Sequence, residues 1–372
     1  MGIKRLEIAG FKSIDSVTLT DLPNYCVFAG ANGAGKSNFF DALKFASAVI
    51  DDGAIKAIRQ FHGYDRIRCV KRSEKELQNF HFGCNVDFSE ISTHFLLDGY
   101  QMDREPELQE QITIGIPGNK PKTYKRGRDG TMPLNAQTQA RFAKYHSALS
   151  GWFDAPSLKV PNWFKNFKVF RVDPFRAKEP DDVGAYPHYL DEYGRNLSTV
   201  LETMQENEDD YETIMDWMSM IVPGLARIHP QRNPLNGTTS IVFQETGTTY
   251  HFPPGLISDG TIYVLCLLTA VLTRIKKPGI TMIEEPERGI HPQAIEQLSL
   301  FFREHASDEH QIFISTHNES FVRNAKAEEL FFAVKKDGRT QFRLGRDAAK
   351  SVEGMPNDKA WLQNMFNGGL PW

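Results

Sequence analysis

A phosphate-loop motif constrains this chain more than any other feature of its sequence. The run Gly30-Ala31-Asn32-Gly33-Ala34-Gly35-Lys36-Ser37 satisfies the pattern G-x-x-x-x-G-K-[ST]. A strand-like segment, Cys26 to Ala29, precedes the motif, and apolar residues recur at helical spacing after Lys36. A strand, a glycine-rich loop and a helix in this order predict a nucleotide-binding loop rather than an ordinary turn at a helix start.

Each residue type in this motif suits a triphosphate bound with Mg²⁺. The glycines let backbone N–H groups converge on the phosphates, and the following helix directs the positive end of its dipole to the same point. We expect Lys36 to reach the β- and γ-phosphates and the Ser37 hydroxyl to bind Mg²⁺. The predicted ligands are therefore ATP and Mg²⁺, with contacts from Asn32, Gly33, Ala34, Gly35, Lys36, Ser37 and Asn38.

Two acidic residues end a second predicted strand. Ile280 to Ile283 form a short apolar run, and Glu284 and Glu285 follow it directly, as in a Walker B segment. We expect Glu284 to hold Mg²⁺, directly or through water, and Glu285 to polarise the attacking water. The structural alternative is that both are charges at a helix start before Pro286.

A histidine follows a third predicted strand. Gln311 to Ser315 form that strand, and His317 comes just after it. Ligands of doubly wound sheets bind at the carboxyl ends of the strands, so His317 is placed to hydrogen-bond the γ-phosphate. A lone histidine is also common as a packed or surface residue. With Lys36 and Glu285, His317 makes up the predicted catalytic set.

The pattern along the chain predicts an α/β protein. Alternating segments such as Ile3 to Ala9 and Phe80 to Phe88 indicate an antiparallel β layer, and residues 197–221 indicate two helices around an acidic turn, Glu206 to Asp210. In the last third, the strands Thr239 to Gln244, 280–283 and 311–315 alternate with helices, which predicts a parallel core sheet. No heptad pattern persists, so we expect no long coiled coil.

This organisation divides the chain into five predicted parts. They are a first ATPase lobe with the phosphate loop at 1–90, an inserted region at 91–165, a helical subdomain at 166–235, a second ATPase lobe at 236–345 and a C-terminal tail at 346–372.

Composition bears on where the protein is found in the cell and says little about its function. The net charge of −4 neither indicates nor excludes a local basic patch, and the four cysteines contain no C-x-x-C pair. The longest apolar run, Tyr263 to Leu272, is too short to span a membrane. We therefore expect a soluble, cytoplasmic protein with no membrane partner.

Taken together, these segments resemble the ABC ATPase superfamily. The resemblance is to the RecF/SMC-like branch and, more closely, to stand-alone AAA family ATPases related to the OLD family of bacterial defence systems. It covers roughly residues 1–50 and 255–345. The run from Glu284 to Pro292, E-E-P-E-R-G-I-H-P, resembles the Walker B and D-loop form of OLD-related ATPases. The implied fold is an ABC ATPase head.

The resemblance implies further site residues. Leu256 to Thr261 resembles the signature motif in an S-D-G-T form, so Ser258, Asp259 and Gly260 are expected at the γ-phosphate held by a second subunit. Phe11-Lys12-Ser13 resembles the F-[RK]-S segment beside the nucleotide, which makes Lys12 a predicted phosphate or ribose contact. An exposed lysine at a strand turn is the alternative for Lys12.

Four features depart from the family pattern or extend it. The metal carboxylate is Glu284 where many relatives have Asp, and no glutamine can be assigned to the Q-loop. OLD nucleases carry a TOPRIM domain, whereas here only a short tail follows the last predicted strand, so we expect no nuclease within this chain. The aromatic tail from Trp361 to Trp372 is expected to dock on the body or on a partner, and a tail that simply covers the core is the alternative.

The resemblance implies a homodimer around ATP, with a larger oligomer left open, and it leaves three functions to compare. The first is a regulatory or sensor ATPase in antiphage defence that controls a separately encoded effector. The second is a DNA-repair or DNA-end-binding ATPase, whose phosphate contacts would be basic residues otherwise explained as solvated surface: Arg66, Arg68, Lys71, Arg72, Lys120, Lys122, Lys125, Arg126 and Arg128. The third, a transporter ATPase, fits the signature poorly.

Overall fold

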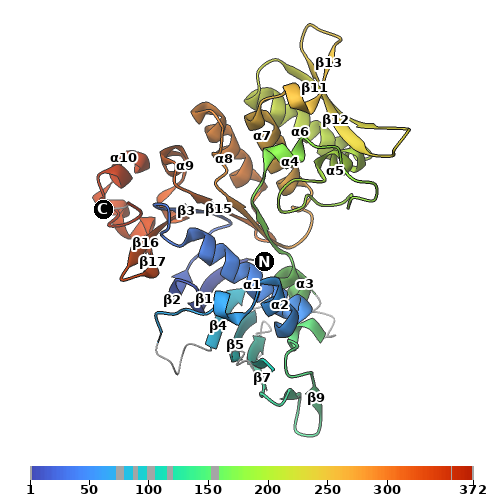
Figure 1. The fold of residues 1–372 in the computed structure, drawn as a ribbon. Coiled ribbons are helices and arrows are strands. Elements are labelled where there is room, and N and C mark those ends of the chain that lie inside the picture. Colours follow the sequence, from blue (N-terminus) through green and yellow to red (C-terminus); the bar gives the residue numbers. More distant parts are fainter. Residues whose placement is uncertain are drawn as a thin grey trace.

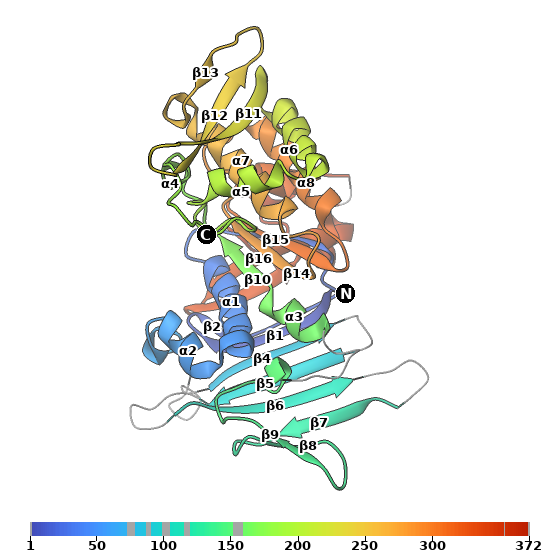
Figure 2. The same ribbon diagram turned by 90° about the vertical axis from the view of Figure 1, so that its right-hand side faces the viewer.

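Two sheets organise the chain in the computed structural model, which describes residues 2–72, 79–86, 91–98, 105–114, 120–151, 159–352 and 354–370. Figures 1 and 2 show one sheet at the centre of the molecule and the other below it, with helices above the central sheet. The mixed α/β prediction, with an antiparallel layer and a parallel core, is confirmed.

The central sheet carries the residues of the predicted site. Its strands lie in the order β10-β14-β15-β3-β16-β17, and all neighbours pair in parallel except β16 and β17. Strands β3 and β15 are buried along their whole length, as expected for a parallel sheet covered on both faces. The bounds are β3 (Tyr25–Ala29), β10 (Phe167–Phe170), β14 (Gly279–Glu284), β15 (His310–Thr316), β16 (Leu330–Lys336) and β17 (Arg339–Leu344).

The lower sheet is antiparallel throughout. Its order is β2-β1-β4-β5-β6-β7, and its strands are β1 (Ile3–Phe11), β2 (Ile14–Thr20), β4 (Asn79–Val86), β5 (Ile91–Asp98), β6 (Glu107–Ile114) and β7 (Lys122–Arg126). A small ribbon of β8 (Thr131–Pro133) and β9 (Gln139–Arg141) follows. The sequence indicated no periodicity for residues 117–165, because these strands are short and largely exposed.

One helix joins the two sheets. Helix α1 (Lys36–Asp52) buries Phe39, Phe40 and Phe45 in a core that also holds residues of the lower sheet and of the central sheet. Helices α2 (Ala54–Gln60) and α3 (Lys159–Lys165) lie beside it (Figure 2). This packing fixes the start of α1 against the central sheet, where the phosphate loop lies.

The opposite face of the central sheet carries a helical lobe. Its helices are α4 (Pro174–Ala177), α5 (Leu197–Met204), α6 (Glu208–Ile221), α7 (Asp259–Leu272), α8 (Pro292–His305) and α9 (Glu319–Asn324). Helices α5 and α6 are the two helices predicted around the acidic turn. The apolar run that begins at Tyr263 is the buried part of α7.

One predicted strand lies in a different sheet. Strand β12 (Thr239–Glu245) pairs antiparallel with β11 (Leu225–Arg232) and β13 (His251–Phe252), so the expectation that it belongs to the parallel core is wrong. The place beside β14 is taken by β10, which lies at the start of the predicted helical subdomain and was not predicted as a strand. Short strands carry too little pattern to choose between partners that are distant in sequence.

The C-terminal segment packs against the edge of the central sheet. Helix α10 (Asn357–Leu362) buries Trp361, and Phe366 stacks on Phe332 of β16 with ring centroids 4.5 Å apart. Docking on the body is thus what the structure shows for residues 354–370, while Pro371 and Trp372 lie outside the described residues.

The helices in the described ranges are short. There, no helix exceeds the 17 residues of α1, in agreement with the prediction of no long coiled coil. In the same ranges, no helix combines the length and apolar character needed to cross a bilayer.

Candidate functional site

The phosphate loop lies at the carboxyl end of β3, where α1 begins. Gly35 caps α1 in the left-handed region with φ of 104°, and a Cβ atom there would lie 1.9 Å from the Thr340 hydroxyl. Glycine is therefore required at this position. The Lys36 ammonium donates to the carbonyl oxygens of Gly30 at 2.6 Å and Ala31 at 3.0 Å, so the lysine folds back across its own loop.

The buried Lys36 ammonium is only partly stabilised by the charges around it. Burial lowers the pKa of the Lys36 ammonium, and the nearby carboxylates of Glu285, Glu287 and Glu284 oppose this effect only in part. A triphosphate would add negative charge beside the ammonium and stabilise its protonated form. The start of a 17-residue helix adds the positive end of its dipole at the same point.

Ser37 and Glu284 form a pair that suits Mg²⁺. The Ser37 hydroxyl donates to Glu284 Oε2 across 3.0 Å, although the two residues are 247 positions apart in sequence. Mg²⁺ prefers hard oxygen ligands at about 2.0–2.1 Å, which places neighbouring ligands of an octahedron about 2.9 Å apart. The separation and the chemistry of the two oxygen atoms therefore fit the predicted metal.

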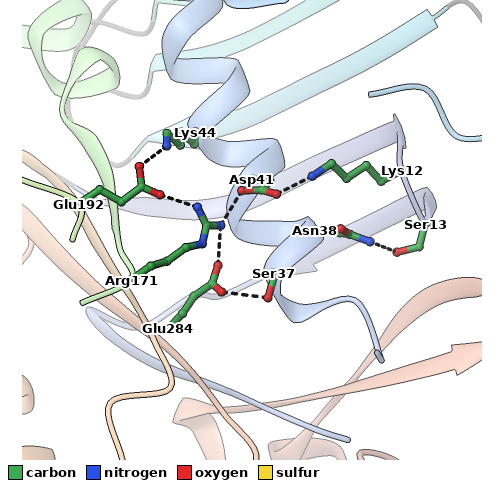
Figure 3. A network of polar contacts seen from close by, with 9 residues as sticks. All are labelled: Lys12, Ser13, Ser37, Asn38, Asp41, Lys44, Arg171, Glu192 and Glu284. Atoms are coloured by element: carbon green, nitrogen blue, oxygen red, sulfur yellow. Dashed lines mark hydrogen bonds and ion pairs between the residues drawn. The ribbon is translucent and has the colours of Figure 1, made fainter. Parts of the chain in front are cut away.

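Arg171 is a site residue that the sequence did not reveal. It follows β10 directly, and its Nη2 donates to Glu284 Oε1 at 2.7 Å and to Asp41 Oδ1 at 2.6 Å (Figure 3). Its Nη1 donates to Glu192 Oε1 at 2.6 Å. Burial alone would lower the pKa of Arg171, but the carboxylates of Glu284 and Asp41 outweigh it and raise the pKa. The arginine thus holds the carboxylate of Glu284, the predicted metal ligand, in place.

The network extends from Arg171 to two lysines on either side. Asp41 accepts from Lys12 Nζ at 2.5 Å, and Glu192 accepts from Lys44 Nζ at 2.6 Å (Figure 3). Burial tends to raise the pKa of Asp41, and Arg171 and Lys12 lower it overall. Asp41 therefore remains an anion that ties Lys12 to the site.

Lys12 and Asn38 each bind another side chain near the start of α1. Lys12 has φ of 49° and binds Asp41, while Asn38 Nδ2 donates to the Ser13 hydroxyl at 2.7 Å. These contacts place both residues beside the phosphate loop, and their contact with nucleotide stays a prediction.

Glu285 has the geometry of a strained, accessible residue. Its φ is 50°, in a region that non-glycine residues adopt rarely, and its side chain is 44% exposed. The backbone is held by two hydrogen bonds, from Glu285 N to Ser315 O at 2.8 Å and from the Tyr263 hydroxyl to Glu285 O at 2.9 Å. The turn thus directs the carboxylate away from the core, as a general base requires.

His317 lies near the Glu285 carboxylate and is held there by Glu287. The sequence analysis assigned no role to Glu287. His317 Nδ1 is 3.8 Å from Glu285 Oε1 and 3.4 Å from Glu287 Oε1. The buried Glu287 carboxylate also accepts from the Thr316 hydroxyl at 2.8 Å and from the His317 backbone N–H at 3.1 Å. Glu287 therefore fixes the loop that carries His317. The third carboxylate in the E-E-P-E run was the available signal.

A cavity of about 570 Å³ opens beside these groups. Its walls are the start of the phosphate loop, His317 and the C-terminal residues Trp361 and Leu370. The C-terminal segment thus contributes to the surface next to the phosphate loop.

The predicted signature residues lie elsewhere, in the helical lobe. The Ser258 side chain caps α7 by accepting from Thr261 N at 3.1 Å, and Asp259 forms an ion pair with Lys178 at 2.5 Å. A Cβ atom on Gly260 would lie 2.5 Å from the carbonyl oxygen of Gly289, so this glycine permits close packing within the chain. Within the described ranges, no hydrogen bond or ion pair joins residues 258–260 to residues 30–38.

The basic residues proposed as DNA contacts do not form one free surface. Arg126 is buried, and its guanidinium donates to backbone carbonyls of the inserted region, so its expected phosphate contact is wrong. Arg72 pairs with Asp15 at 3.0 Å. Lys122, Lys125 and Arg128 are exposed. The DNA-binding alternative gains no support from this arrangement.

A family model described as "AAA domain, putative AbiEii toxin, Type IV TA system" matches residues 133–323. The match covers slightly more than half of the 372 residues. It includes Arg171, the signature segment, Glu284, Glu285 and His317, and it begins after the phosphate loop.

Two curated relatives share shorter stretches with the chain. The chromosome partition protein Smc of Synechocystis sp. is 24% identical over 216 residues, which are 56% of this chain and 17% of that protein. The chromosome partition protein Smc of Synechococcus sp. is 43% identical over 58 residues, which are 15% of this chain and 5% of that protein. Both stretches span less than a fifth of the relative's own length.

Solved structures show the same fold over nearly the whole chain. The SmcHead bound to the C-winged helix domain of ScpA has a TM-score of 0.56 at 16% identity and covers 92% of this chain and 97% of that chain. The Smc head domain with an extended coiled coil, bound to the C-terminal domain of ScpA from Pyrococcus furiosus, has a TM-score of 0.50 at 14% identity and covers 95% of this chain and 98% of that chain. The predicted head fold is confirmed.

Proposed function

Because the chain belongs to the AAA domain family whose model it matches, and has the fold of an SMC head, we propose that it hydrolyses ATP at an interface between two copies and thereby regulates a separate effector. The family and the fold agree with the RecF/SMC-like resemblance of the sequence. A bacterial antiphage system is the proposed setting, supported by the OLD-related motif and by the toxin named in the family's description.

One observation carries the proposal. The phosphate loop, the Ser37–Glu284 pair and the Glu285–His317 pair meet at one edge of the central sheet, while Ser258 at the signature lies in the other lobe without a contact to that loop. Two copies related by a two-fold axis would each supply the phosphate loop of one site and the signature of the other. ATP binding would then favour the closed dimer by linkage.

Each residue of the candidate site has its own role in this proposal. The loop amides and Lys36 bind the phosphates, and Arg171 orients Glu284 beside Ser37. Mg²⁺, when bound there, neutralises charge on the phosphate oxygens. Glu285 accepts a proton from the attacking water, and His317 is positioned by Glu287 next to it.

Replacement of Glu285 by glutamine tests the proposal. Glu285→Gln removes the general base and should lower kcat by roughly 10²–10⁴ while leaving ATP binding intact. The variant should therefore accumulate as an ATP-bound dimer, measured by size-exclusion chromatography with light scattering. Adding Lys36→Ala should restore the monomer in the presence of ATP. A Glu285→Gln protein that stays monomeric with saturating Mg–ATP would contradict the proposal.

The same trapped variant tests the regulatory role. We expect affinity-tagged Glu285→Gln, expressed from its native operon, to retain a neighbouring gene product in ATP and release it after transfer to ADP. If no protein encoded in the operon co-purifies in ATP and dissociates in ADP, the result would argue against a separate effector.

A further inference from the structure

A short segment connects the two halves of the proposed composite site within one chain. At residue 171 the segment holds the metal carboxylate, since Arg171 donates to Glu284 at 2.7 Å. Seven residues later it holds the signature turn, since Lys178 Nζ donates to Ile257 O at 2.7 Å and to Asp259 Oδ1 at 2.5 Å. We infer that Lys178 is a positioning residue that orients the signature turn toward the nucleotide of a second copy of this chain, an inference that rests on the proposed function.

The segment between these two residues is built as a rigid connection. Its first part is tied to the neighbouring loop by Arg171 N to Glu192 O at 2.8 Å and Asp173 N to Tyr193 O at 3.0 Å. Asp173 then caps α4 by accepting from Phe175 N at 3.1 Å, and a proline at the first helical position fixes φ. These contacts fix the conformation of the chain between Arg171 and Lys178.

The ammonium of Lys178 binds the signature turn on both sides of Ser258. The carbonyl of Ile257 precedes the serine, and the carboxylate of Asp259 follows it. Ser258 itself is bonded to Thr261 N, so its position depends on the first turn of α7. Lys178 consequently fixes the direction in which the Ser258 hydroxyl and the α7 N-terminus face.

The position of the turn matters because of symmetry. In a two-fold dimer, the spacing between the phosphate loop and the signature of one chain must match the same spacing in its partner for both sites to close together. Lys178 and Arg171 tie that spacing to the metal carboxylate of the same chain. The Lys178–Asp259 ion pair itself adds little to folding stability, because the Asp259 side chain is 46% exposed.

The contact can be removed without disturbing the nucleotide-binding loop. Lys178→Met keeps the methylene chain and loses the ammonium, and Lys178→Arg keeps a cation that can bind both acceptors. Lys276→Met is the control for losing a lysine–aspartate ion pair elsewhere in the same lobe, because Lys276, which is more exposed than Lys178, pairs with Asp210 at 2.6 Å. All three are made in the Glu285→Gln background, where dimers accumulate.

Sedimentation at a series of protein concentrations with Mg–ATP measures dimer affinity, and fluorescence titration with labelled ADP measures binding to the monomer. We expect Lys178→Met to weaken the dimer about tenfold, with ADP affinity and melting temperature unchanged. Lys178→Arg should recover most of the loss, and Lys276→Met should equal its parent.

Two results would overturn the inference while leaving the proposed function intact. One is a Lys178→Met protein that dimerises at the same concentration as its parent, and the other is an equal loss in Lys276→Met. If the parent Glu285→Gln protein itself fails to dimerise with ATP, the proposed function fails, and the inference fails with it.

Discussion

Glu287 is a buried carboxylate at the edge of the candidate site, and its environment sets both its charge and its task. Oε1 binds the Thr316 hydroxyl and the His317 N–H, whereas Oε2 is buried without a hydrogen-bond partner among the described residues. Burial raises the pKa of this carboxyl group. When the folded-state pKa exceeds the unfolded value, the ionised form destabilises the fold, and that cost develops as pH rises from the unfolded pKa through the folded pKa.

The variant Glu287→Gln separates the effect of this residue on protein stability from its effect on ATPase activity. The amide oxygen can still accept a hydrogen bond, so we expect a higher melting temperature than wild type at pH 8, with the difference shrinking toward pH 5. We also expect kcat to fall roughly tenfold, because the loop that carries His317 loses its carboxylate anchor. Thermal denaturation at both pH values and steady-state ATPase assays measure these effects. The exposed Glu296→Gln is the control, and a Glu287→Gln protein less stable than wild type at pH 8 would refute the stability argument.

At the scale of elements, strand β15 depends on a neutral histidine at its start. His310 Nε2 is 2.8 Å from the Thr281 hydroxyl of β14, and Nδ1 is 2.7 Å from Lys277 O, so this tautomer carries its proton on Nδ1. Burial, reinforced by the charge of Arg274, lowers the pKa of His310 to about 4. For a histidine with a lowered folded-state pKa, stability is lost as pH falls from the unfolded value toward the folded one.

This strand should therefore make the fold acid-sensitive. From a folded pKa of about 4 and an ordinary value near 6.5, His310 should remove about 2 kcal/mol from the free energy of unfolding between pH 7 and pH 5. We expect His310→Gln to be less stable than wild type at pH 7 but to lose less on acidification, as measured by chemical denaturation. The exposed His188→Gln should keep the wild-type slope, and an unchanged slope in His310→Gln would exclude this origin.

At the scale of the whole molecule, the candidate site is divided between lobes. Helix α1, which follows the phosphate loop, and helix α7, which begins at the signature turn, lie on opposite sides of the central sheet (Figure 2). Packing decides which residue of the signature turn can be replaced in a test of this arrangement. A side chain at Gly260 would collide with Gly289 O, whereas Ser258 contacts the start of its own helix and can be replaced at the cost of a cap.

Mixing two inactive variants tests this division directly. Lys36→Ala lacks the phosphate-binding lysine, Ser258→Arg blocks the signature, and each should be inactive alone. In an equal mixture, half of the dimers are mixed and each holds one intact composite site, so up to about a quarter of wild-type ATPase activity should return. Activity is measured after mixing at concentrations above the dimer affinity. No recovery, with both variants folded by circular dichroism, would show that the two motifs do not act across an interface.

The sequence by itself determined where the motifs with a local pattern lie relative to strands and helices. The phosphate loop follows β3 and starts α1, Glu284 ends β14 and Glu285 follows it, and His317 follows β15. A strand, a loop and a helix can be recognised within about 20 residues, and parallel strands bring their carboxyl ends to one edge. The antiparallel layer and the absence of a long coiled coil among the described helices follow from periodicity in the same way.

Only the tertiary structure decided which distant residues complete the site. Arg171 and Glu284 are 113 positions apart, and Lys178 and Asp259 are 81 apart. The contacts of Glu287 depend on β15 lying beside β14. In the core sheet, β10 pairs with β14, whereas β12 belongs to another sheet. A charged side chain carries no local signal of its partner, because pairing depends on the packing of strands and helices whose order in space differs from their order in the chain.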